Sequence, residues 1–174
     1  MKFYRPIPLD KEIKVNPKSF IVSKTDYKGN ILYCNDTFSE VTGYDQSEVL
    51  GAPHNILRHP DMPRIIFFLM WQRLKSGKNI QALVKNLART GEYYWVSTDF
   101  EIQQDERNNQ PTYIAYRRAP SAKAIETISP FIAYCLPLRN NIAWRLLSPT
   151  YKGIWMRDTK HLMNLCTPFY NPKG

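Results

Sequence analysis

The sequence predicts an α+β domain, in which a five-stranded antiparallel sheet carries short helices and one longer helix over one face. Three observations support this fold class. Two short segments with alternating apolar residues come first and are separated by turn residues. Helical segments follow, and three further strand segments, joined by turns, close the order. One face of such a sheet must pack against the helices, so a pocket can form between them.

The first elements are short. Residues 19–35 alternate apolar and polar side chains on both sides of the turn 26–30, which predicts two strands. Residues 36–44 then place Phe38 and Val41 on one helical face. Asn35 or Asp36 can cap this helix, and Gly43 ends it. A second helical turn is expected near residues 45–51.

The connector PHNILRHPDMP, residues 53–63, makes a poor helix and a poor strand, because its prolines fix the backbone. A longer helix is predicted from Asp61, whose carboxylate suits the first turn. Ile66, Met70 and Leu74 share one face of this helix, and Gly77 ends it.

Three strands of a meander follow, in residues 79–89, 91–104 and 111–119. Turn residues lie between them at 89–91 and at 105–109. Together with the first two strands they complete the five-stranded sheet.

The predicted domain covers residues 19–119. Residues 1–18 are polar and contain prolines, and we expect them to form an N-terminal arm outside the core. Residues 120–174 form a basic, aromatic extension, since positions 121–174 hold 7 Lys/Arg against 2 Asp/Glu. A helix is expected to begin in this extension and to end at Pro130, because proline lacks the backbone N–H.

Composition indicates a folded chain in the cytoplasm. The 174 residues are 43% apolar and 22% charged, with no apolar run long enough to span a bilayer and no secretory signal. The 3 cysteines are far apart, and neither they nor the 3 histidines have metal-ligand spacing. The net charge of +9 comes without a nucleic-acid-binding motif, so we expect a solvated basic surface and no nucleic-acid partner.

Several stretches are similar to the PAS domain. NDTFSEVTGY (residues 35–44) and VKNLARTGEYYWV (residues 84–96) resemble PAS domains in general. GAPHNILRHPDMP (residues 51–63) is narrower and resembles the flavin-binding PAS domain of Aer-type aerotaxis and energy-taxis receptors. The resemblance implies a PAS fold with noncovalently bound FAD between sheet and helices. It also implies a redox sensor, whose partner is a chemotaxis transducer or another signalling protein, and a homodimer is a further expectation.

The resemblance assigns the FAD site to Arg58, His59, Asp61 and Asn86. The chemistry of these side chains agrees with it. Arginine forms forked hydrogen bonds to phosphate, histidine can donate to phosphate or ribose, and an asparagine amide matches the donor and acceptor edge of a flavin. Aromatic walls would come from Trp71 and Trp95, with Tyr33 and Tyr93. The full set of candidate cofactor-binding residues is Asn35, His54, Arg58, His59, Asp61, Trp71, Asn86 and Trp95.

Structural roles remain open for the same residues. Arg58 and Asp61 can pair with each other, Asp61 can cap the helix, His54 can bond a backbone carbonyl, and Trp71 and Trp95 can be core. The chain also departs from the aerotaxis receptor, which has a Trp and a Gly in the strand before Asn86, where this sequence has Ile80 and Ala82.

Other functions of such a domain require particular residues. A light–oxygen–voltage sensor needs a reactive cysteine in the connector, and residues 53–63 contain none. A haem-binding PAS domain would use His54 or His59 as axial ligand. An enzyme is not expected, because no nucleophile–base pair or metal cluster is evident. A cofactor-free interaction or dimerisation module is the main alternative.

Overall fold

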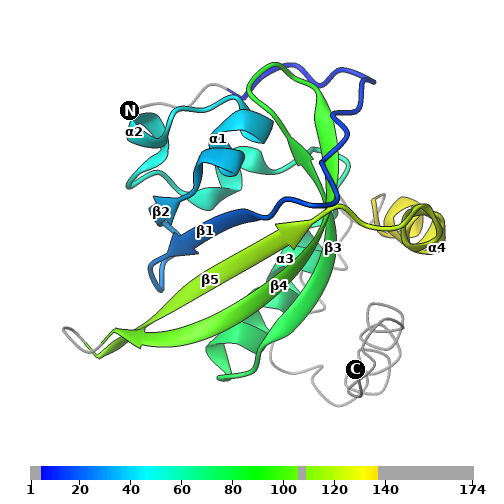
Figure 1. Cartoon of the computed structure of the whole chain (residues 1–174). Coiled ribbons are helices and arrows are strands. Elements are labelled where there is room, and N and C mark those ends of the chain that lie inside the picture. Colours follow the sequence, from blue (N-terminus) through cyan, green and yellow to red (C-terminus); the bar gives the residue numbers. More distant parts are fainter. Residues whose placement is uncertain (1–4, 106–108, 137–174) are drawn as a thin grey trace, which may run out of the picture.

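A computed structural model describes residues 5–105 and 109–136, which contain one five-stranded antiparallel sheet. The strand order is β2-β1-β5-β4-β3, so the first strand of the chain lies beside the last (Figure 1). The predicted sheet and the α+β class are confirmed. The strands are β1 (Ile21–Thr25), β2 (Ile31–Cys34), β3 (Ile80–Leu87), β4 (Tyr93–Asp105) and β5 (Gln110–Arg118).

The short helices α1 (Asp36–Thr42) and α2 (Gln46–Val49) follow the sequence prediction. The 3-10 helix η1 (His54–Leu57) was not predicted, because it lies in the proline-rich connector that was expected to make a poor helix. Asn35, not Asp36, caps α1, since its side chain accepts a hydrogen bond from the Phe38 N–H. Gly43 ends α1 with a positive φ of 73°, a conformation that favours glycine.

The longer helix α3 (Arg64–Lys75) begins three residues later than predicted. Pro63 precedes it with extended backbone at ψ 140°, and the proline ring disfavours helical geometry at Met62. The prediction that Asp61 starts and caps the helix is therefore wrong. The rest of the prediction is confirmed, because Met70 and Leu74 are buried on one face.

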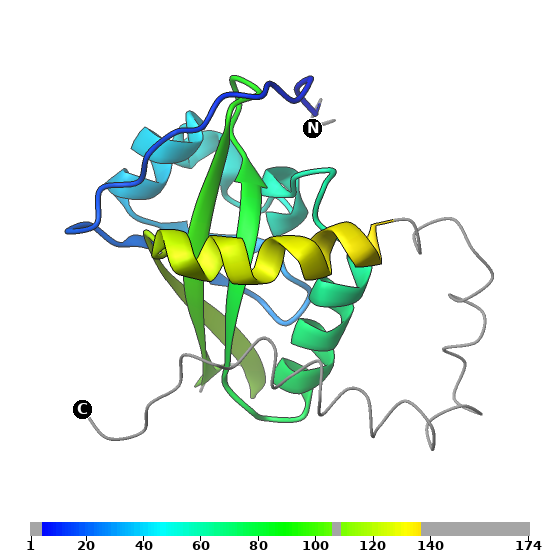
Figure 2. The same cartoon turned by 90° about the vertical axis from the view of Figure 1, so that its right-hand side faces the viewer.

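A further helix, α4 (Ala122–Cys135), crosses in front of the strands in Figure 2, whereas α1 and α2 lie behind them. Ala124, Ile128 and Ile132 are its buried residues. The prediction that this helix ends at Pro130 is wrong. Burial of Ile128 and Ile132 on either side of the proline stabilises the helix, which offsets the lost backbone hydrogen bond.

The N-terminal arm runs along the first residues of β4, which extend past the end of β5, near the β3–β4 turn. The Leu9 N–H donates to the Gly91 carbonyl at 2.7 Å, and the Ile13 N–H donates to the Tyr93 carbonyl at 2.8 Å. Val15 is only 8% exposed and belongs to the core. The arm is therefore part of the packed structure, and the expectation that it lies outside the core is wrong for Val15. Its prolines interrupt the alternation by which a strand is recognised in a sequence.

Gly91 shows how closely the arm approaches the sheet. A Cβ at this position would lie 2.2 Å from the Ile7 carbonyl oxygen, and φ is +91°. Gly77 has a similar φ of +75° but no atom within 4 Å of a built Cβ, so it is a matched control for backbone strain alone.

We expect Gly91→Ala to lower the free energy of unfolding by at least about 1 kcal/mol more than Gly77→Ala does, because only Gly91→Ala also displaces the arm. Urea denaturation measures the two losses, and hydrogen exchange in residues 7–13 should be faster in Gly91→Ala alone. Equal losses with unchanged exchange would contradict this role of the arm.

Candidate cofactor pocket

A cavity of about 310 Å³ lies between the inner face of the sheet and the helical side of the domain. Side chains alternate along each strand, so every second residue faces this cavity. On β4, Thr98 and Phe100 face it. The cavity is lined by Ser23, Thr25, Lys28, Gly29, Pro53, His54, Asn55, Arg58, Phe67, Met70, Trp71, Leu74, Val84, Asn86, Thr98, Phe100, Tyr113, Ala115 and Arg117.

The apolar wall comes mainly from α3. Trp71 meets Tyr113 of β5 edge-on, with ring centroids 5.4 Å apart and the planes at 78°. The β1–β2 turn reaches the same indole through Gly29, where a Cβ would lie 3.0 Å from the Trp71 ring. Trp71 is thus a cavity residue, where the sequence analysis places it.

The polar end of the cavity is built around Arg117, which is 2% exposed. Its Nη1 donates to Ser23 Oγ at 3.0 Å, and its Nη2 lies 2.7 Å from His54 Nε2. A guanidinium has donors only, so Nε2 of His54 is the acceptor and the imidazole is neutral. Burial, together with the positive charge of Arg117, lowers the pKa of His54 to about 3.

Arg117 pairs with no carboxylate in the part of the chain that the structure describes. Burial lowers the pKa of Arg117 to about 10, which still leaves it charged near neutral pH. A buried charge that has hydrogen-bond partners but no opposite charge beside it disfavours the folded state by several kcal/mol. Arg117 can therefore donate hydrogen bonds to an electronegative group of a ligand in the cavity.

Two more polar side chains face the same space. Thr98 is fully buried, and its Oγ1 has no hydrogen-bond partner in the part of the chain that the structure describes. Asn86 is buried at 4% exposure and lines the cavity from β3. A ligand with a hydrogen-bonding edge would satisfy Thr98 and meet Asn86 and Arg117 together.

Arg58 lies at the cavity and is joined to the sheet edge. Its backbone forms a bridge to Asn86, so the structure brings these two predicted residues together. Its Nη2 donates to the Met62 carbonyl at 2.9 Å, and its guanidinium carbon lies 4.9 Å from the centroid of the Phe67 ring. The connector thus holds a cation at the cavity wall.

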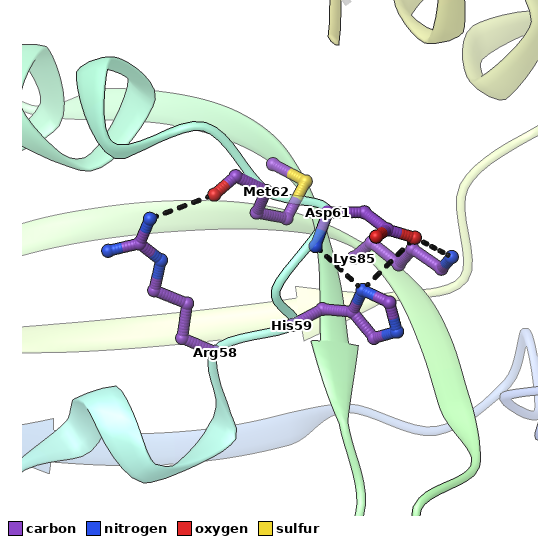
Figure 3. A network of polar contacts seen from close by, with 5 residues as sticks. All are labelled: Arg58, His59, Asp61, Met62 and Lys85. Atoms are coloured by element: carbon purple, nitrogen blue, oxygen red, sulfur yellow. Dashed lines mark hydrogen bonds and ion pairs between the residues drawn. The ribbon is translucent and has the colours of Figure 1, made fainter. Parts of the chain in front are cut away.

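His59 and Asp61 do not line the cavity, although the sequence analysis places them in the cofactor site. Figure 3 shows both side chains beside Lys85. His59 Nδ1 accepts a hydrogen bond from the Asp61 N–H at 3.1 Å, and its ring meets Tyr93 edge-on at 6.0 Å. The Asp61 carboxylate pairs with Lys85 at 3.0 Å. Burial, with the nearby charge of Lys85, lowers the pKa of His59. Both side chains hold the connector and do not point toward the cavity.

Asn35 also lies outside the cavity lining and has a structural role. Its side chain caps α1, accepts from the Val22 N–H at 3.0 Å and donates to the Phe20 carbonyl at 2.9 Å. It thereby joins the start of α1 to β1.

Three aromatic residues that were expected to form walls of the pocket do not line the cavity, namely Tyr33, Tyr93 and Trp95. Val96 and Thr98 face inward, so Trp95 and Tyr93 face the other side of the sheet. Tyr33 is 51% exposed. The aromatic residues that line the cavity are Trp71, Phe67, Phe100 and Tyr113.

Comparison with known proteins agrees with this architecture. Residues 31–116 match the sequence family described as the PAS fold. These residues form a PAS domain. The aerotaxis receptor of Escherichia coli K12 is 36% identical over 110 residues, which cover 63% of this chain and 22% of the receptor. The nitrogen fixation regulatory protein of Klebsiella pneumoniae is 31% identical over 104 residues, 60% of this chain and 21% of that protein. The chain thus spans less than a quarter of either relative.

Solved structures share the fold. A light–oxygen–voltage domain studied with a flavin analogue aligns with a TM-score of 0.55 and 21% identity, over 66% of this chain and 86% of that one. The dark structure of the Aureochrome1 light–oxygen–voltage domain aligns with a TM-score of 0.52 and 17% identity, over 70% and 83% of the two chains.

Among residues 5–105 and 109–136, no helix is both long and apolar enough to cross a membrane. Within the same ranges, His, Cys, Asp and Glu side chains form no group of three or more that suits a metal ion. Cys34 is buried with a free thiol, while Cys166 lies outside the described residues.

Proposed function

We propose that this PAS domain binds a flavin, with FAD as the ligand, and acts as a redox sensor in bacterial signal transduction. The observation that carries the proposal is the buried charge of Arg117 at one end of an apolar cavity, where no carboxylate among the described residues pairs with it. A flavin ring has one apolar end and one edge rich in carbonyl oxygens and ring nitrogens. Arg117, Thr98 and Asn86 suit that edge, and the aromatic residues of α3 and the sheet suit the ring faces.

Volume and charge favour a partly enclosed dinucleotide. A cavity of about 310 Å³ is at the small end for ligand pockets, so it accommodates a ring system and leaves the rest of an FAD outside. Lys28 and Arg58 line the same cavity and supply cations that suit a pyrophosphate. The prolines on both sides of the connector limit the conformational entropy lost when Arg58 binds.

The similarity to the aerotaxis receptor supports a sensing role, because the match lies over the PAS domain. Bound flavin would supply reversible electron uptake. Asn86 and Arg117 would then adjust their hydrogen bonds to a change of charge at the ring edge. Because β3 and β5 carry these residues, the sheet can pass the change to a partner, which we propose to be a chemotaxis transducer or another signalling protein. Placement in the cytoplasm and a sensor role without enzymatic activity belong to the same proposal.

An absorption spectrum of the purified protein, before and after dithionite, tests the proposal. We expect the blue and near-ultraviolet bands of a flavin, bleached reversibly by the reductant. A protein that stays colourless after refolding with excess FAD would refute the flavin reading. A red protein would indicate haem, which the geometry disfavours because the His54 Nε2 already accepts from Arg117.

A cofactor-free interaction module is the second candidate. The observation in its favour is a group of exposed apolar side chains that do not line the cavity, with Phe20 at 52%, Leu32 at 49% and Tyr33 at 51% exposure. A colourless protein that still binds a partner, or itself, would support this alternative, and sedimentation velocity would detect self-association.

A further inference from the structure

The connector between η1 and α3 passes around the edge of β3. Arg58 forms a backbone bridge to Asn86, and its side chain lines the cavity. The next residues turn the other way, and Figure 3 shows His59 and Asp61 beside Lys85, with Arg58 pointing away from them. Two neighbouring residues of β3 thus meet the connector, because Lys85 faces the outer side of the sheet and Asn86 the inner side.

Lys85 is held in one geometry on the outer side. Its Nζ lies 3.0 Å from Asp61 Oδ2 and 4.1 Å from the centroid of the Tyr93 ring. Its side chain is 16% exposed, whereas that of Asp61 is 55% exposed. The Tyr93 ring restricts the lysine stem, so little further side-chain entropy is lost when the ion pair forms.

We propose that Lys85 is a positioning residue of the flavin site, although it lies on the face of the sheet opposite the cavity. Its ion pair with Asp61 fastens the connector to β3 and so fixes Arg58 against Asn86 at the cavity wall. The Arg58 side chain bonds the Met62 carbonyl at 2.9 Å, so residues 58–62 form a closed loop that the pair can hold as one unit. The proposal rests on the proposed function, because it takes flavin as the ligand of that site.

The physical reason is preorganisation. Without the pair, residues 58–62 are held less firmly against β3, so more of their ordering takes place at the moment of binding, and that ordering lowers affinity. An ion pair with one exposed partner contributes little to overall stability, so the variants should fold. The effect should therefore appear in flavin affinity and in local hydrogen exchange, with little change in the thermal midpoint.

The experiment is a double-mutant cycle with FAD titrated into refolded apo-protein. We expect Lys85→Met and Asp61→Asn each to raise the FAD dissociation constant by about three- to fivefold. The double variant should bind FAD no more weakly than either single variant. Lys85→Arg keeps the positive charge and should bind FAD with the affinity of the wild-type protein. Lys24→Met is the matched control, since Lys24 lies on β1 and its side chain donates a hydrogen bond to Gln103 of β4 at 3.3 Å.

Additive losses in the cycle, no rescue by arginine, or an equal loss in Lys24→Met would overturn the proposal. Failure of the proposed function is distinguishable, because wild-type protein would then take up no FAD at all. In that case the proposed role of Lys85 in flavin binding is refuted as well. Amide hydrogen exchange at residues 58–62 would still show whether Lys85→Met loosens the connector.

Discussion

Arg117→Met is expected to weaken FAD binding on the order of 100-fold and to leave the apo-protein at least as stable as wild type. Hydrogen bonds from a charged donor in a buried site contribute about 1.5–3 kcal/mol each, so loss of contacts to the flavin edge should have this effect. In the apo-protein the same guanidinium is buried and forms no ion pair within residues 5–105 and 109–136. Replacing it by an apolar side chain of similar length should raise the free energy of unfolding by on the order of 2 kcal/mol.

Methionine does not leave the neighbours of Arg117 without partners. Ser23 Oγ lies 3.2 Å from His54 Nε2, so the hydroxyl can donate to the imidazole when the guanidinium is gone. If Arg117 lowers the stability of the apo-protein but raises the affinity for FAD, its role is to bind the ligand and not to stabilise the fold.

Arg118→Met is the matched control for Arg117→Met. Arg118 is the next residue of β5, has a half-exposed side chain and lies 3.8 Å from Asp99. It should change neither FAD affinity nor stability beyond about 0.5 kcal/mol. Urea denaturation of the two apo-proteins and titration with FAD measure both quantities. If Arg117→Met destabilised the apo-protein and left affinity unchanged, Arg117 would be a structural residue and the flavin proposal would lose its main support.

The order of elements could be predicted because periodicity and turn residues are local properties. The β1–β2 turn at residues 26–30 and the cap at Asn35 are examples, since each depends on neighbouring residues. The start of α3 was misplaced because Pro63 allows either a first helical turn or an extended N-cap. The helix α4 continues past Pro130 because Ile128 and Ile132 are buried in the core. This is a tertiary contact, which the residues next to Pro130 in sequence do not predict.

The site was predictable only in part, because alternation does not say which face of a strand points inward. Trp95 was assigned to the wall, but the register of β4 turns it outward. Arg117 was missed, although an arginine among the apolar residues of a strand was the available sign. His59 and Asp61 are close to Arg58 in sequence, yet the chain turns after Arg58, so they lie beside Lys85 while Arg58 lines the cavity. Trp71 was placed in the wall, and it faces the cavity from α3.

Acid should destabilise the domain well above the pH at which carboxylates are protonated. The pKa of His54 is about 3 in the folded state, against an ordinary value of 6.5, since burial and Arg117 disfavour its protonation. Between these two values the unfolded chain binds a proton that the folded protein does not. The stabilising contribution is therefore complete above pH 6.5 and is lost as the pH falls toward 3. His59, whose pKa is also lowered, should add to the same trend.

His54→Gln should flatten this dependence. Glutamine does not titrate and can accept from Arg117 through its amide oxygen. We expect the free energy of unfolding of wild-type protein to fall by up to about 1.4 kcal/mol per pH unit for each such histidine, between about pH 7 and pH 5. In His54→Gln the free energy of unfolding should fall less steeply with pH, by the contribution of one histidine. Urea denaturation at several pH values within this interval avoids titration of most carboxylates. An unchanged slope in His54→Gln would mean that His54 is protonated, or reaches water, in the folded protein, and Arg117 would then lack the neutral acceptor that holds it at the cavity.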